Sequence, residues 1–173
     1  MHSLGHRRIA LLTGLHEGEL PAHEREAAFR AALKRRGLKV PPNFIVSRFD
    51  DAGQTEITTR ELLQLPQPPT AIIVGTDLPG LVVERAARNM NLRVPEDLSI
   101  VAFGNLRIAE WADPPLTLVA QPFYEMGRVA VRELLSRLPR AGQTWSDAAL
   151  LKRLPTELTV RASTARVRTG GSA

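Results

Sequence analysis

The chain has 173 residues with 23 basic and 18 acidic side chains and no cysteine, which excludes disulfide scaffolds, thiol nucleophiles and cysteine zinc sites. Its length fits one compact α/β domain. The four histidines, at positions 2, 6, 16 and 23, lack the spacing of a ligand pair, so we expect neither a metal nor a cofactor. The longest apolar runs are far shorter than a membrane span, and no signal-peptide core is present. The sequence therefore predicts a cytoplasmic protein without membrane contact.

The positive charge is concentrated near the C-terminus. Residues 1–127 contain 14 Lys and Arg against 15 Asp and Glu, whereas residues 128–173 contain 9 against 3. A solvated helix face and a loose tail explain this excess better than a phosphate-binding surface, because only Trp145 is interleaved with the charges.

Short apolar runs alternate with amphipathic segments along the first half of the chain. Gly37 is placed to end the first helix, and the prolines of 66–69 end the second, whose inward side we expect to include Ile57, Leu62 and Leu63. The pattern predicts strands at 8–13, 44–48, 71–75 and 99–103, and helices at 22–36, 55–65 and 78–89.

After the proline pair at 114–115 the alternation continues. It predicts a strand at 116–121, a helix at 123–138, a loop at 139–153, a last strand at 158–162 and a frayed tail at 163–173. Alternating strands and helices with near-continuous apolar strands are typical of a parallel sheet that is buried on both sides. We therefore expect a three-layer α/β fold, with a parallel sheet and helices on both faces.

The motifs of common α/β enzymes are absent from the sequence. The glycines after the first strand read Gly14-x-x-x-Gly18, which matches neither GxGxxG nor the Walker loop. No serine lies in a GxSxG elbow. An oxidoreductase and a serine hydrolase are therefore disfavoured.

Polar residues follow three of the predicted strands directly, where open α/β sheets place their ligand crevice. They are Phe49 to Asp51, Thr76-Asp77 and Gly104-Asn105. Arg25, near the start of the first helix, has a fork of donors suited to hydroxyl or carboxylate groups. Two structural explanations remain open. Asp77 can cap a helix that begins at Leu78, and Arg25 can pair with Glu24 or Glu26 on the surface.

Six segments in order resemble the sensor domains of the LacI/GalR family of bacterial transcriptional regulators. Arg25-x-x-Ala28-Phe29-x-x-Ala32-Leu33 is similar to the family's RxxGFxxAL helix, and residues 69–77 to its PTAIFAxND turn. The other four segments are 4–14, which resembles the strand that opens the C-terminal lobe, 92–105 (GLxVPxDxSVxGFDD), 114–122 (PPLTTVxQP) and 154–164 (LPTELxVRxST).

The resemblance implies a periplasmic-binding-protein-like fold of type I, mostly its C-terminal lobe. Residues 1–118 would form that lobe, 119–138 a strand and helix that cross to a first lobe, 139–153 a loop, 154–164 a return segment and 165–173 a tail. A complete member is roughly twice as long and begins with a helix-turn-helix headpiece, so we expect operator DNA to be bound only through a headpiece absent from these residues.

The resemblance also implies roles for single residues. Arg25 would hold effector hydroxyls or a carboxylate, Asp77 would orient the turn below the effector, and Phe49 and Phe123 would form apolar walls. Thr76 stands where the family usually has Asn, and Gly104 where it has an acidic residue that accepts bonds from sugar hydroxyls. The full expected effector site comprises Arg25, Phe49, Thr76, Asp77, Gly104, Asn105, Gln121 and Phe123.

A homodimer interface is implied around the helix after Asp77 and the segment at Trp111. The expected interface residues are Leu81, Glu84, Arg85, Arg88, Trp111 and Ala112. Trp111, a large aromatic beside a proline pair, is suited to an interface anchor. Capping of the sheet edge is the alternative role for Trp111.

The sequence thus predicts a non-enzymatic, effector-sensing and dimerising part of a LacI/GalR-type regulator, with a small sugar-like or other metabolite as effector. Two alternatives remain: a sugar-binding protein of the transport class with the same fold, and a small α/β enzyme that uses Asp77 with Arg25.

Overall fold

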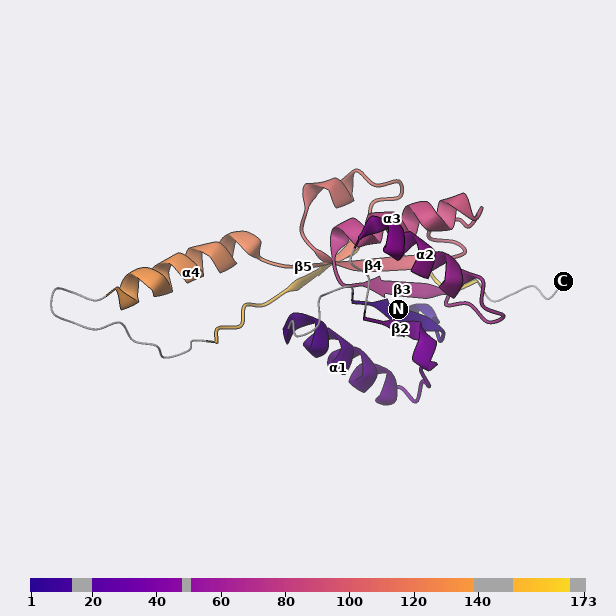
Figure 1. The fold of residues 1–173 in the computed structure, drawn as a ribbon, viewed down its shortest axis with the longest axis horizontal. Helices are drawn as coiled ribbons and strands as arrows, with labels where there is room; N and C mark the ends of the chain where they lie inside the picture. The colour runs from indigo at the N-terminus through magenta and orange to yellow at the C-terminus, as the bar shows by residue number, and fades with distance from the viewer. Residues whose placement is uncertain (14–19, 48–50, 139–150, 169–173) are drawn as a thin grey trace.

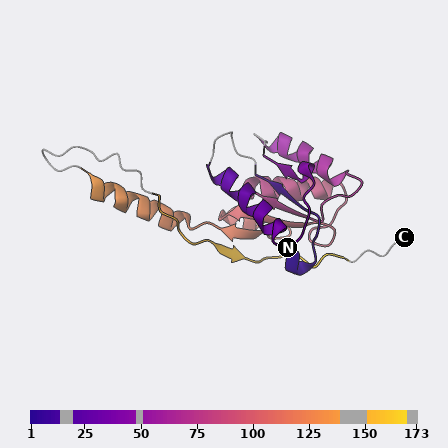
Figure 2. The same ribbon diagram turned by 90° about the horizontal axis from the view of Figure 1, so that it is seen from below.

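The computed structural model describes residues 1–13, 20–47, 51–138 and 151–168 (Figures 1 and 2). At its centre is a six-stranded sheet with the strand order β2-β1-β3-β4-β5-β6. The strands are β1 (Ile9–Leu12), β2 (Ile45–Val46), β3 (Ala71–Val74), β4 (Ser99–Gly104), β5 (Thr117–Ala120) and β6 (Glu157–Thr159). The first five run parallel, and β6 is antiparallel to β5.

Helices lie on both faces of this sheet. The helices are α1 (Leu20–Lys34), α2 (Ala52–Leu63), α3 (Asp77–Asn89) and α4 (Phe123–Arg137), with short 3-10 turns η1 (His2–Leu4), η2 (Pro42–Phe44) and η3 (Arg107–Glu110). Figure 1 shows α1 on one face and α2 and α3 on the other, while α4 projects away from the sheet. The expected three-layer α/β fold is therefore confirmed.

One strand departs from the all-parallel expectation. β6 runs antiparallel because the chain leaves the sheet at the end of β5, continues through α4 and re-enters beside the same strand from the far end. The predicted strand at 158–162 is correspondingly shorter, at 157–159. The other predicted elements are present with shifted ends, and the expected loop at 139–153 lies outside the described residues except for 151–153.

The core is divided by the sheet into two apolar clusters. On the α2 and α3 side, alternate strand residues such as Leu12, Ile72 and Ile100 pack against helix residues such as Leu62 and Val83, all at most 3% exposed. On the α1 side, a smaller cluster contains Ile9, Leu11 and Ala71 with Phe29 and Leu33. The apolar run of each central strand thus serves both layers.

The inward face of α2 differs from the expectation at one position. Leu62 and Leu63 are buried as predicted, but Ile57 is 51% exposed. Thr55, Thr58 and Thr59 are buried in its place, and the hydroxyl of Thr59 donates to the Thr55 carbonyl at 2.7 Å. This internal hydrogen bond allows a threonine to be buried on a helix face.

The described part of the expected tail is not frayed. The Ser163 side chain is fully buried, its hydroxyl donates to the Ile100 carbonyl at 2.7 Å, and it accepts from the Thr117 N–H at 2.8 Å. Further along, the Val167 N–H donates to the Leu4 carbonyl at 2.9 Å. Residues 163–167 therefore close the amino ends of the strands, because the polar groups there need partners once they are removed from water.

His6 also holds residues 163–167 in place, through hydrogen bonds of its ring. One ring nitrogen, Nδ1, is 2.9 Å from the Thr70 hydroxyl, and the other, Nε2, is 3.0 Å from the Ala165 carbonyl oxygen, so Nε2 carries the proton. The side chain is 2% exposed, and burial lowers the pKa of His6.

We expect stability to fall when His6 is forced to take a proton. Because the pKa of His6 is lower in the folded than in the unfolded chain, the unfolded state binds protons more readily, and the free energy of unfolding should decrease as the pH falls below about 6.5. Urea unfolding at pH 7.5 and pH 5.5 measures this effect. His6→Asn should be less stable at pH 7.5 and should flatten the pH dependence, whereas His23→Asn, at an exposed position, should retain it. An unchanged pH slope in His6→Asn would contradict the assignment.

Candidate functional site

A cavity of about 970 Å³ opens beside the α1 face of the sheet. Its floor contains Leu11, Ile73 and Phe103, which come from three neighbouring strands. α1 forms one wall, and α4 with residues 151–156 forms the opposite wall. The cavity is thus lined by the sheet, by α1, by α4 and by residues 151–156, and most of its lining is apolar.

Arg25 is held over an aromatic ring in this cavity. Its guanidinium carbon lies 4.8 Å from the centroid of Phe103, within cation–π distance. The side chain is half-buried, and the neighbouring glutamates are engaged elsewhere: Glu24 with Arg153, and Glu26 with Arg30. The planar group of Arg25 thus lies over the Phe103 ring beside the cavity.

The two carboxylates that line the cavity are each paired with a cation. Glu24 accepts from Arg153 at 2.6 and 3.0 Å, and this bond holds the pKa of the Glu24 carboxyl below its usual range. Glu133 of α4 accepts from Lys152 at 3.0 Å. Both pairs connect a helix to residues 152–153 at the cavity wall.

Asp77 joins the ends of β3 and β4. Its Oδ2 accepts the Leu106 N–H at 2.8 Å and its Oδ1 accepts the Leu78 N–H at 3.1 Å, and the residue is 5% exposed. The expectation that Asp77 caps a helix starting at Leu78 is wrong, since α3 begins at Asp77 itself and Thr76 is the cap residue, without a side-chain cap bond. The carboxylate instead fixes the turn that follows β4.

Only some of the expected effector residues line the cavity. Arg25 and Gln121 line the cavity, whereas Asp77 and Gly104 contact one another at the ends of β3 and β4. Thr76 is half-buried and Asn105 is exposed at the same edge of the sheet. Phe123 is 46% exposed on α4 and does not line the cavity, and Phe49 lies outside the described residues.

Sequence reasoning missed the floor of the cavity. Phe103 and Ile73 belong to apolar strand runs and carry no signal that separates them from the core. Alternation along a strand does show that residues 101 and 103 share a face opposite to 100 and 102, but not that α1 leaves part of this face open.

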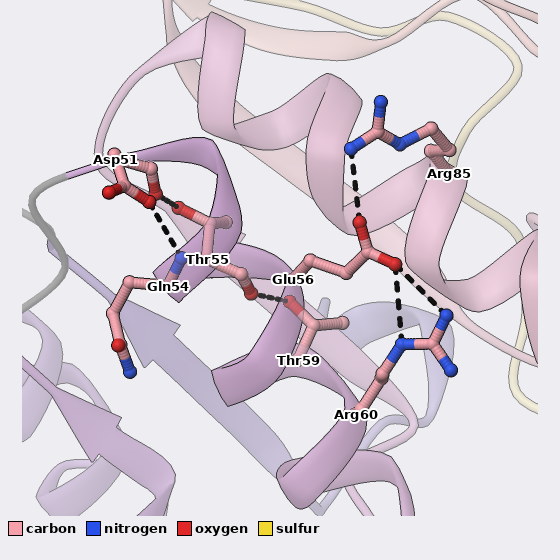
Figure 3. Close-up of polar contacts among 7 residues, drawn as sticks. All are labelled: Asp51, Gln54, Thr55, Glu56, Thr59, Arg60 and Arg85. Atoms are coloured by element: carbon pink, nitrogen blue, oxygen red, sulfur yellow. Dashed lines mark hydrogen bonds and ion pairs between the residues drawn. The ribbon is translucent and has the colours of Figure 1, made fainter.

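A cap at Asp51 fixes the start of α2, two positions after the expected effector residue Phe49. In Figure 3, the Asp51 carboxylate accepts the Gln54 N–H at 2.8 Å, and the Asp51 carbonyl accepts the Thr55 hydroxyl at 2.8 Å. These bonds satisfy orphan groups of the first turn of α2.

Glu56 ties α2 to α3 in the same region. Its Oε1 is 2.9 Å from the Arg60 guanidinium, within α2, and its Oε2 is 3.0 Å from that of Arg85 in α3 (Figure 3). These bonds lower the pKa of the Glu56 carboxyl, with the Arg60 contact as the larger cause.

The residues expected at a dimer interface fall into buried and exposed sets. Glu84 is 5% exposed and accepts from Arg88 at 2.7 Å, and burial raises the pKa of its carboxyl while Arg88 opposes that rise. Leu81 and Ala112 pack partly against the core, and Arg85 is engaged with Glu56. Trp111 is 75% exposed. Four exposed apolar side chains lie on α3, η3 and the adjoining residues, and are called the α3/η3 patch: Leu78, Leu106, Ile108 and Trp111.

In the part of the chain that the structure describes, no helix is long and apolar enough to cross a membrane. The same residues bring together no group of three or more His, Asp or Glu side chains that could hold a metal ion.

A known protein family matches nearly the whole chain. Residues 1–164 match the family model described as periplasmic binding protein-like domain. The chain belongs to the periplasmic-binding-protein-like domain family. The HTH-type transcriptional repressor CytR of Escherichia coli (strain K12) is 39% identical over 167 residues, which are 95% of this chain and 47% of the repressor. The chain therefore spans about half the length of the repressors it matches, and its relatives are LacI-family regulators.

Solved structures agree with this assignment. A putative LacI transcriptional regulator from Bacillus cereus superposes with a TM-score of 0.86 at 33% identity, covering 95% of this chain and 57% of that one. A LacI-family regulator from Enterococcus faecium, solved with bound ribose, gives a TM-score of 0.79 at 29% identity and covers 96% and 60%. The periplasmic-binding-protein-like fold extends over nearly all of this domain.

Removing the cap at Asp51 should destabilise the start of α2. Asp51→Ala should lower the free energy of unfolding by about 1 kcal/mol, the usual cost of losing an N-cap, while Asp51→Ser should keep most of it because serine can accept the same N–H bond. Chemical denaturation measures both. Equal stability of Asp51→Ala and the parent would show that the cap does not hold the start of α2.

Proposed function

We propose that this domain is the effector-sensing and dimerising part of a cytoplasmic LacI-family transcriptional regulator. The observation that carries the proposal is the cavity at which Arg25, Phe103 and Gln121 meet, in a chain whose relatives are repressors. The guanidinium of Arg25, the ring of Phe103 and the amide of Gln121, beside apolar walls, are the groups expected of a small-molecule binding site.

In this proposal the ligand acts through differential affinity. A small molecule that contacts both this domain and a preceding lobe of a regulator stabilises their closed arrangement. The resulting change in the equilibrium between closed and open forms alters how paired DNA-binding elements are spaced. Contact with operator DNA would then belong to a helix-turn-helix element outside these residues.

The exposed side of α4 fits the same assembly. No residue of α4 is buried, and Val131, Leu134 and Leu135 are 51 to 62% exposed. An amphipathic helix that projects from the sheet is stable when its apolar side packs against another layer. We assign that side to a first lobe of the regulator, for which α4 is the crossover element.

Ligand contact should depend on Arg25. We expect nuclear magnetic resonance titration of this chain with ribose and with sugar acids at millimolar concentration to perturb Arg25, Phe103 and Gln121. Arg25→Gln should weaken binding at least about tenfold, since one charge-assisted bond contributes roughly 1.5 to 3 kcal/mol. Arg30→Gln, five residues further along α1 at an exposed position, is the matched control and should bind as the parent does. Perturbations confined to other regions would contradict the proposed site.

The α3/η3 patch should mediate self-association. Trp111 is the most exposed of its apolar residues and is of the type enriched at interface centres. Trp111→Glu should weaken dimerisation at least about tenfold in sedimentation equilibrium, because a charge would have to be buried. Ile57→Glu, which replaces a similarly exposed apolar residue on α2, should leave it unchanged. Equal effects of both variants, or a dimer disrupted only by Leu135→Glu on α4, would contradict this interface.

A further inference from the structure

Three of the four residues of the α3/η3 patch lie on the segment between β4 and β5. They are Leu106, Ile108 and Trp111, and the last of them is 75% exposed. A side chain in solvent binds a second copy more tightly when its backbone is already ordered, because less conformational entropy is then lost on association. The bonds that hold this segment therefore affect how strongly the patch can associate.

Two arginines hold the chain on either side of Trp111. Before it, Glu110 Oε1 accepts a bond from Nη2 of Arg161 at 3.0 Å. After it, the carbonyl of Asp113 accepts a bond from the guanidinium of Arg88. Trp111 is therefore presented by a short stretch of chain that is held at both ends.

The two arginines come from different parts of the fold. Arg88 belongs to α3, which is itself part of the patch. Arg161 lies in the return segment, a few residues after Thr156 in the cavity wall. The pair between Glu110 and Arg161 thus joins two segments that are 51 positions apart in the sequence.

Arg161 is held in place by bonds other than the one to Glu110. Its Nη1 donates to the Leu116 carbonyl at 2.9 Å, its backbone N–H donates to the Thr117 hydroxyl oxygen at 3.0 Å, and its side chain is only 18% exposed. An exposed ion pair contributes little, because both side chains must be ordered and water screens the charges. In this pair one partner is already ordered and mostly buried, so the bond determines where Glu110 lies.

Taking the proposed dimerising function as given, we propose that Arg161 is a positioning residue of the association surface. Through Glu110 it orders the segment that presents Trp111 to a second copy. The four apolar residues of the patch then do not set the strength of association alone, because the return segment holds one end of the stretch that carries Trp111.

Sedimentation equilibrium and thermal unfolding of the whole chain test this role. Glu110→Ala, at a side chain that is 50% exposed, should weaken dimerisation at least about threefold and lower Tm by less than about 3 °C. Arg161→Lys keeps the charge but lacks the fork that contacts Leu116 and Glu110 together, so it should weaken dimerisation at least as much. The double variant should match Arg161→Lys, and additive effects on dimerisation would overturn the proposal.

The fluorescence of Trp111 separates positioning from a general loss of stability. The chain has two tryptophans, so Trp111 is the only one in a Trp145→Phe background. At protein concentrations at which the parent is monomeric, Glu110→Ala should increase the local mobility of the Trp111 indole in the anisotropy decay. An unchanged decay would show that Glu110 does not order this segment and would overturn the proposal.

Glu26→Ala is the matched control. Glu26 pairs with Arg30 at 2.8 Å on α1, on the opposite face of the sheet from α3, so its loss should leave dimerisation and Trp111 mobility unchanged. If Trp111→Glu weakens dimerisation but Glu110→Ala has no more effect than Glu26→Ala, the positioning role is overturned and the proposed association surface stands. If the parent does not dimerise, or Trp111→Glu leaves the dimer intact, both are overturned.

Discussion

The need to pair polar groups at the two ends of a buried parallel sheet controls how this domain is built. The central strands are covered on both faces, so the backbone and side-chain groups at their ends are removed from water. Every buried side-chain nitrogen or oxygen among the described residues has a hydrogen-bond partner. The two ends of the sheet meet this requirement with different residues. A distant segment pairs the polar groups at the amino ends, and Asp77 pairs those at the carboxyl ends, where we propose that a ligand binds.

At the amino ends of the strands, the pairing is done by a segment that is distant in sequence. Ser163 bridges β4 and β5, and His6 holds the same segment through the Ala165 carbonyl. The amino ends of the strands are thereby closed by short hydrogen bonds, and the side chains of Ser163 and His6 that make them are buried. Because residues 163–167 follow α4 and β6, this closure also ties α4 and residues 151–156, which form a cavity wall, back to the sheet.

At the carboxyl ends, Asp77 closes only the turn between β4 and η3, and the neighbouring face of the sheet remains open toward α4. A single helix, α1, covers that face, which leaves Phe103 accessible beneath Arg25. The same turn begins the segment that carries Trp111. One carboxylate therefore holds in place the turn that leads to the proposed association surface.

The sequence by itself determined the central strands, such as 71–74 and 99–104, and most helices, because apolar periodicity and the flanking glycines and prolines are local signals. It also predicted Arg25 and Gln121 at the site through their place in family-like motifs. Only the tertiary structure decided the direction of β6, the role of Ser163 in the return segment and the position of Phe103 below Arg25. These features depend on which distant segments pair, and a pattern of neighbouring residues carries no information about distance across the sheet.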